Sequence, residues 1–185
     1  LGCPRTKDGV IVDPGDAVGD QVAAARRHDL RITRILLTHA HLDHVSGVAA
    51  AKRAFDVPVY LHRDDVFLYD AAAQQGLMFG VRIEQPPPVD RFYEMSAGED
   101  LGFGDFAVDV LHTPGHCPGG VCLAVGRRDS HARECLRRAR SRCTDEHRDR
   151  VLRDPRRCRG PAAFALARAS GLKRLSPPAG SVPAN

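Results

Sequence analysis

Three histidines and an aspartate lie within seven residues, in the run Thr-His-Ala-His-Leu-Asp-His at residues 38–44. This run follows the apolar stretch Ile35-Leu36-Leu37, which is typical of a buried strand. Imidazole and carboxylate groups ligate zinc and iron, and the run contains no cysteine, so the set favours a catalytic rather than a structural ion. We therefore expect a fold in which a strand ends at Leu37 and the residues that follow it form a metal site.

The spacing divides the four side chains into two pairs. His39 and His41 are two residues apart, so on an extended segment they point the same way and can share one ion. Asp43 and His44 come where an amphipathic helix over residues 45–55 begins, so they can face a second position beside the first. Taken singly, a histidine at a strand end is a satisfied polar group and an aspartate before a helix is an N-cap. The four together indicate a metal site.

A second informative segment begins at an alternating strand over residues 106–110 and continues as His-Thr-Pro-Gly-His at residues 112–116. Pro114 and Gly115 predict a tight turn, which would hold His116 in a fixed position at the end of the strand. Taken alone, this segment is compatible with an ordinary turn that carries a surface histidine. Beside the upstream cluster, His116 is the third candidate ligand for the first ion.

Together these motifs resemble the metallo-β-lactamase superfamily, and most closely its hydroxyacylglutathione-hydrolase-like (glyoxalase II-like) branch. The resemblance covers residues 2–125 and includes Ile-Val-Asp-Pro-Gly-Asp at residues 11–16. It implies an α/β fold, the αββα sandwich of that superfamily. It also implies that the first ion is bound by His39, His41 and His116, and the second by Asp43 and His44.

The function implied by the resemblance is that of a zinc-dependent hydrolase with one or two Zn²⁺ ions, iron and manganese being alternatives. A metal-bound hydroxide would attack the carbonyl of a small-molecule thioester, and Asp43 would act as the catalytic group that orients the hydroxide or manages its proton. Asp13 matches a loop position beside the site. There a supporting role and a plain turn role within Asp-Pro-Gly-Asp are both compatible with the sequence.

Two parts of the family pattern are missing from the chain: a strand-borne Gly-Asp whose carboxylate bridges the two ions, and a later Gly-His. Arginines crowd the sequence after Gly126 instead, and the charge splits accordingly, with a net of −6 over residues 1–126 and +10 over residues 127–185. The overall pI of about 8.9 therefore describes the tail. We expect a metallo-β-lactamase-like domain over residues 1–126 and an atypical arginine-rich tail over residues 127–185, so that the C-terminal half of the sandwich is missing or irregular.

Three hypotheses compete for the tail. A basic arm for nucleic acid is disfavoured, because the arginines lack interleaved aromatic residues and the tail carries Cys135, Cys143 and Cys158. A divergent second half of the fold would replace the lost ligands from among Asp129, Asp145, Asp149, His131 and His147. No alternating apolar run supports that half. The abrupt loss of pattern near Gly126 favours an out-of-frame translation of a GC-rich gene, and a disordered segment is the other expectation for residues 127–185.

Two alternatives to a hydrolase stay open. An iron-dependent, persulfide dioxygenase-like oxidoreductase needs a mononuclear site of two histidines and one carboxylate; His39 and His116 can serve, but the matching distal aspartate is absent. The other alternative is an inactive, truncated or frameshifted relative that binds metal only partially.

The remaining expectations concern location and secondary structure. The chain begins at Leu1 and not at methionine, which suggests a fragment of a longer reading frame, and it has no run of eighteen apolar residues, so we expect a cytoplasmic protein without membrane insertion.

His28 and His62 are expected at the surface, His112 as an orienting group and Cys117 as a small side chain. Strands are expected at residues 10–12, 32–37, 57–61, 103–111 and 121–125, and helices at residues 16–27 (capped by Asp16), 45–55 and 64–80.

Overall fold

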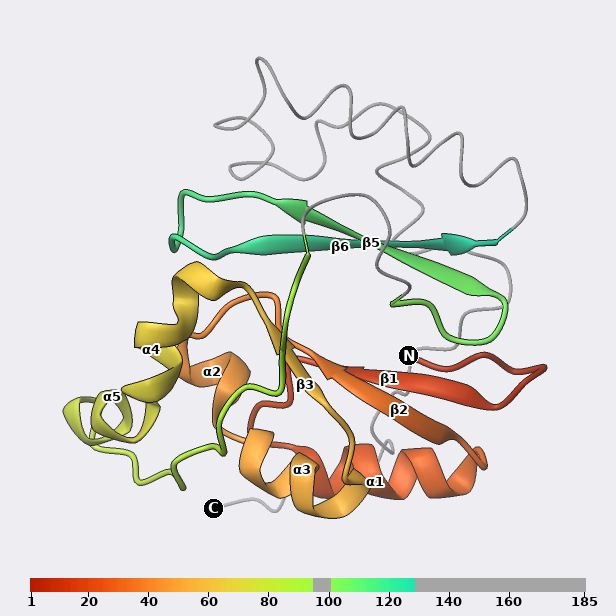
Figure 1. Cartoon of the computed structure of the whole chain (residues 1–185). Helices are drawn as coiled ribbons and strands as arrows, with labels where there is room; N and C mark the ends of the chain where they lie inside the picture. Colours follow the sequence, from red (N-terminus) through yellow and green to blue (C-terminus); the bar gives the residue numbers. More distant parts are fainter. Residues whose placement is uncertain (95–100, 129–185) are drawn as a thin grey trace, which may run out of the picture.

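The computed structural model describes residues 1–94 and 101–128, so the arginine-rich tail from residue 129 onward, with its candidate substitute ligands, lies outside the described residues. Within them, strands and helices alternate before a final β-hairpin (Figure 1). The strands are β1 (Asp8–Val12), β2 (Arg31–Leu36), β3 (Val59–Leu61), β4 (Arg91–Phe92), β5 (Phe106–His112) and β6 (Val121–Arg127). The helices are α1 (Val18–Arg27), α2 (Leu42–Val45), α3 (Val48–Phe55), α4 (Val66–Asp70) and α5 (Ala72–Met78), with the 3-10 turn η1 (Arg63–Asp65).

Strands β1 to β4 form a parallel sheet in the order of the sequence. Val12 pairs with Leu36, and Leu36 pairs with Tyr60. The chain therefore leaves β1, β2 and β3 at the same edge of the sheet. Ligands of open parallel sheets bind beyond the carboxyl ends of the strands, so this edge is the place for a site.

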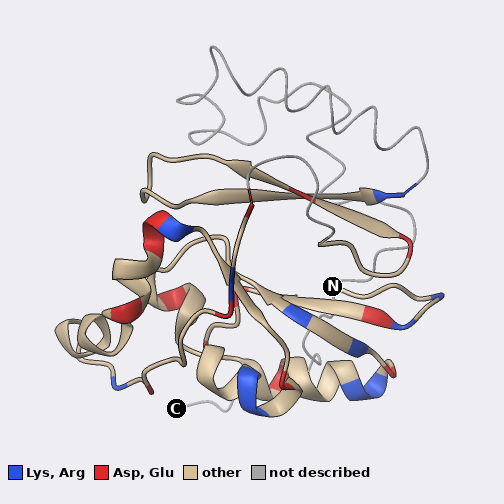
Figure 2. Cartoon of the chain, in the orientation of Figure 1, with Lys and Arg blue, Asp and Glu red and all other residues tan. Residues whose placement is uncertain are grey.

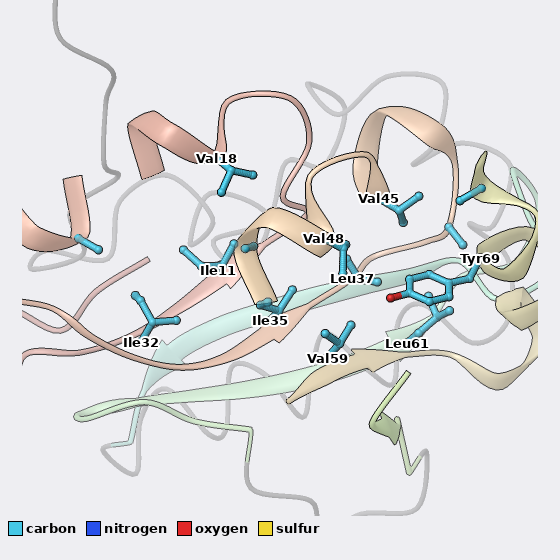
Figure 3. Close-up of a cluster of buried hydrophobic side chains, with 14 residues drawn as sticks. Ile11, Val18, Ile32, Ile35, Leu37, Val45, Val48, Val59, Leu61 and Tyr69 are labelled. Atoms are coloured by element: carbon cyan, nitrogen blue, oxygen red, sulfur yellow. The ribbon is translucent and has the colours of Figure 1, made fainter. Parts of the chain in front are cut away.

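The parallel sheet is buried on both faces. One face packs against α1 and α3 through a core that includes Ile35 and Val59, the side chains drawn with their neighbours in Figure 3. The other face, which presents Val10 and Leu36, is covered by the antiparallel pair β5–β6 (Figure 1). Successive strand residues point to opposite faces, which is why neighbours such as Ile35 and Leu36 belong to different cores. The described layers are thus helix, sheet and sheet, in agreement with the αββα expectation over this region.

The first helix differs from its prediction at its start. Asp16 was expected to cap it, but α1 begins at Val18 with Ala17 as the N-cap and without a side-chain capping bond. The predicted basic C-terminus is present, because Arg26 and Arg27 occupy the last turn. The last turn of α3 is also basic, with Lys52 and Arg53, and Figure 2 shows these side chains' positions in blue. Positive charges at the C-terminus of a helix interact favourably with the helix dipole.

The single helix predicted over residues 45–55 is wrong, because the chain breaks into α2 and α3 at Gly47. The Gly47 N–H donates to the carbonyl of Pro14 at 2.8 Å, and a Cβ at this position would lie 2.0 Å from the Gly15 carbonyl oxygen. This close approach of two backbones fixes the corner beside the sheet edge. The helix predicted over residues 64–80 is likewise divided, into η1, α4 and α5, and the short strand β4 was not predicted.

No helix in residues 1–94 and 101–128 combines the length and the apolar character needed to cross a bilayer.

Gly47→Ala is expected to lower the free energy of unfolding by about 1–3 kcal/mol, because the added methyl group must displace the backbone of residues 14–15. Gly19→Ala in α1 is the matched control. Its Cβ meets no atom within 4 Å, so alanine should stabilise the helix by up to about 1 kcal/mol. Urea unfolding of both variants measures the difference, and equal effects would refute the close-approach argument.

Candidate metal centre

Three imidazoles converge at the sheet edge. His39 and His41 come from the segment after β2, and His116 comes from the turn between β5 and β6. One ligand nitrogen from each lies within 4.8 Å of the other two, and His41 Nδ1 is 2.9 Å from His116 Nε2. Ligand nitrogens around a tetrahedral zinc ion lie ~3.3 Å apart when the bonds are about 2.0–2.1 Å long. The donor set and its spacing therefore fit a divalent ion.

Local backbone structure explains this convergence. Residues 38–41 lie between β2 and α2, and His41 is extended at φ −74° and ψ 155°, so His39 and His41 project to the same side. In the other segment Gly115 has φ +151°, a conformation that favours glycine. The Val121 N–H donates to the Thr38 carbonyl at 2.9 Å. This bond joins the two ligand-bearing segments across the two sheets.

Asp13 supports the centre through Thr38. The carboxylate accepts two hydrogen bonds of 2.7 Å, one from the Thr38 N–H and one from the Thr38 hydroxyl, which lies 3.1 Å from His39 Nδ1. Because a hydroxyl has a single proton and Thr38 donates it to Asp13, Thr38 accepts from His39 Nδ1–H. That assignment of the tautomer leaves Nε2 of His39 with the lone pair that a metal ligand needs.

Asp13 therefore fills both roles that the sequence left open. It is also a turn residue, with φ +45° in the left-handed region, and its carbonyl accepts from the Gly15 N–H at 2.9 Å.

The electrostatics keep His39 neutral. Burial, followed by the nearby imidazoles of His44 and His41, lowers the pKa of His39 below its ordinary value. Only a neutral imidazole offers a lone pair to a metal ion. Burial and the neighbouring imidazoles therefore favour the neutral form of His39, which can bind a metal ion, at neutral pH.

The second predicted pair is arranged differently from the three imidazoles. The His44 ring lies beside His39, with centroids 3.9 Å apart, but its Nδ1 is 3.0 Å from Asp13 Oδ2 and its Nε2 is 3.3 Å from Asp43 Oδ2. The Asp43 side chain is 81% exposed. The structure thus brings His39, His41 and His116 together, and it holds His44 between the carboxylates of Asp13 and Asp43.

Asp65 is a residue of the site that the sequence analysis missed. Its carboxylate is fully buried and accepts from the Ala40 N–H at 3.1 Å and from the Gly119 N–H at 2.6 Å. Burial, followed by a hydrogen bond to Asp65, raises the pKa of the Cys117 thiol to about 12. Cys117 is therefore a small buried side chain, as predicted. The sequence signal that could have revealed Asp65 is its place one short turn after the strand expected at residues 57–61.

A second group of candidate ligands is formed by His62, Asp64 and His112. The prediction of a surface position for His62 is wrong, because this residue is 8% exposed and its ring stacks on His112 at 4.2 Å with 9° between the planes. Lone pairs in two parallel ring planes do not point at a common ion. In addition, His62 Nδ1 accepts from the Asp64 N–H, and His112 Nε2 lies 2.8 Å from the Pro118 carbonyl oxygen. The stack therefore acts as a packing contact between the end of β5 and the residue that precedes η1.

Comparison with known families identifies the domain. Residues 5–129 match the metallo-β-lactamase superfamily. The chain belongs to this superfamily. Its described region accordingly has the α/β metallo-β-lactamase fold, and the His-rich centre lies within a domain of metallo-hydrolases.

Three relatives illustrate the similarity. The hydroxyacylglutathione hydrolase GloC of Haemophilus influenzae is 33% identical over 116 residues, which cover 62% of this chain and 54% of that protein. The fold also matches the crystal structure of TTHA1623 in a di-iron-bound form, with a TM-score of 0.52 and 40% sequence identity. The match covers 60% of this chain and 54% of that one. The BLEG-1 B3 metallo-β-lactamase is 35% identical with a TM-score of 0.55, covering 64% and 56%. The chain spans about half the length of the curated superfamily members that it matches.

His39→Ala and His116→Ala are each expected to abolish retention of metal through desalting, because each removes one of three converging ligands. His28→Ala, at the end of α1, is the control and should retain metal like the wild type. Elemental analysis of metal per folded chain is the measurement, and equal retention in all three variants would refute the assignment.

Proposed function

We propose that the domain hydrolyses small-molecule thioesters of the hydroxyacylglutathione type, using a divalent metal ion bound by His39, His41 and His116. The observation that carries the proposal is the convergence of three imidazoles, with ligand atoms within 4.8 Å of one another, at the carboxyl edge of the parallel sheet. The similarity to GloC, a hydroxyacylglutathione hydrolase, supports the choice of substrate.

The ligand set supports a catalytic ion. All three ligands are imidazoles, and three protein ligands leave a coordination position open to water or substrate. Held by His39, His41 and His116, a divalent ion would polarise the substrate carbonyl as a Lewis acid and would lower the pKa of water at neutral pH. Zinc is the proposed ion. Iron is the alternative, since the related TTHA1623 is known in a di-iron-bound form.

The chain's own groups orient the reactants. Asp13 acts through Thr38 to hold His39 with Nδ1 protonated, and His116 closes the site from the other sheet. The exposed carboxylate of Asp43 lies 3.3 Å from His44 Nε2, and in this proposal it accepts the proton of the attacking water. Water oxygen adds to the acyl carbon, the carbon–sulfur bond breaks, and the electron pair of that bond leaves with the glutathione thiolate. The products are a hydroxy acid and glutathione.

The direct test is turnover of S-lactoylglutathione by the 185-residue chain loaded with Zn²⁺ or Fe²⁺, followed by release of free thiol. Asp43→Asn should lower kcat by roughly 10²–10⁴-fold if its carboxylate accepts the proton. Asp29→Asn is the matched control, because Asp29 precedes β2 at the opposite edge of the sheet and lies in the left-handed conformation that asparagine tolerates.

Two outcomes would contradict the proposal. Equal turnover by the Asp43 and Asp29 variants would remove the catalytic role of Asp43. A metal-loaded chain that opens a chromogenic cephalosporin but leaves the thioester intact would assign the site to β-lactam hydrolysis, the activity in the name of the related BLEG-1.

A further inference from the structure

Asp65 occupies an unusual position between the two ligand-bearing segments. Its carboxylate is fully buried, and each of its oxygens accepts a backbone N–H: Oδ2 from Ala40 and Oδ1 from Gly119. Ala40 lies between the ligands His39 and His41, and Gly119 lies in the turn that carries His116. One side chain therefore contacts both halves of the candidate metal centre without being one of its ligands.

The surroundings of Asp65 are built for this contact. A Cβ on residue 119 would lie 2.7 Å from Asp65 Cγ, so only glycine lets the backbone approach the carboxylate this closely. The Cys117 thiol is a further hydrogen-bond partner of Asp65. A buried carboxylate is costly unless its oxygens accept hydrogen bonds, and here the two ligand-bearing segments provide them.

The two bonded segments belong to different sheets. Ala40 follows β2 of the parallel sheet, whereas Gly119 precedes β6 of the antiparallel pair. The nearby stack of His62 on His112 also joins the residue before η1 to the end of β5. The residues of η1 and the one before it thus hold the turn of His116 against the segment of His39 and His41.

We propose that Asp65 is a positioning residue, which fixes the separation between the His39–His41 segment and the His116 turn and thereby sets the affinity of the centre for divalent ions. This inference rests on the metal site of the proposed function. Groups that orient metal ligands typically change metal affinity by about 10–100-fold when they are removed.

The test measures the Zn²⁺ dissociation constant of the 185-residue chain by competition with a chromophoric chelator. Asp65→Asn keeps the shape of the side chain but replaces one acceptor oxygen by an NH₂ group, which then faces a backbone N–H. We expect its dissociation constant to rise by at least about 10-fold. Tyr69→Phe is the matched control, because it keeps the ring of this α4 residue and removes only the 2.8 Å hydrogen bond from its hydroxyl to the Pro87 carbonyl, a bond that involves neither ligand-bearing segment. Its dissociation constant should stay within about 2-fold of the wild-type value, even where its melting temperature falls as far as that of Asp65→Asn.

A second pair of variants leaves the carboxylate in place and keeps the test available when Asp65→Asn does not fold. Gly119→Ala pushes the turn away from Asp65 and should also weaken Zn²⁺ binding about 10-fold. In Gly120→Ala the nearest contact is the Cys117 sulfur at 3.1 Å, so binding should change far less. Amide hydrogen exchange without metal gives an independent readout, in which Asp65→Asn should accelerate exchange at Ala40 and Gly119 together.

The outcomes separate this inference from the proposed function. A wild-type chain that binds no Zn²⁺ would contradict the proposed function. Wild-type binding with unchanged affinity in Asp65→Asn and Gly119→Ala would contradict the positioning role alone, as would an equal loss of affinity in Tyr69→Phe.

Discussion

The candidate metal centre depends on the parallel pairing of β1, β2 and β3. The register that aligns Val12, Leu36 and Tyr60 makes the chain leave all three strands at one edge. Each exit then contributes a different part: Asp13 after β1, two imidazoles after β2 and Asp65 after β3. A one-residue shift in the pairing would turn the side chains of that strand to the opposite face. It would also displace the residues that follow the strand, so that they would no longer meet at the site.

Within this edge, imidazoles offer the ligand atoms and carboxylates hold the backbone. Asp13 accepts from the Thr38 N–H, and Asp65 accepts from the Ala40 N–H two residues later. The segment that carries His39 and His41 is no longer paired as a strand, so its backbone donors need other partners. Two aspartates from neighbouring exits provide them, and the segment gains a defined conformation without regular secondary structure.

The sequence was sufficient for the features that depend on short-range patterns. The apolar stretch before the His-rich run and the alternation over residues 106–110 located two of the main strands, and the spacing of His39, His41 and His116 relative to strand ends predicted the three imidazoles that the structure brings together. The break at Gly47 escaped prediction because the helical pattern continues through it; the cause is the backbone of Gly15, which is distant in sequence. His62 and Asp65 escaped for the same reason, since they contact residues distant in sequence: His62 stacks on His112 at the end of β5, and Asp65 accepts from Gly119 in the turn beyond it. The high exposure of the Asp43 side chain could not be predicted either, because it depends on which segments pack nearby and not on the local sequence pattern.

The 2.9 Å approach of His41 to His116 joins residues that are 75 positions apart in the chain. Closing so long a loop is entropically costly, so contacts of this kind form late relative to local helices and neighbouring strands. The complete set of three ligands exists only after the β5–β6 hairpin has docked on the parallel sheet. An ion that binds all three imidazoles therefore stabilises the docked state alone, in proportion to RT ln(1 + [ion]/Kd). Such an ion would therefore act as a clasp between the two sheets as well as a cofactor.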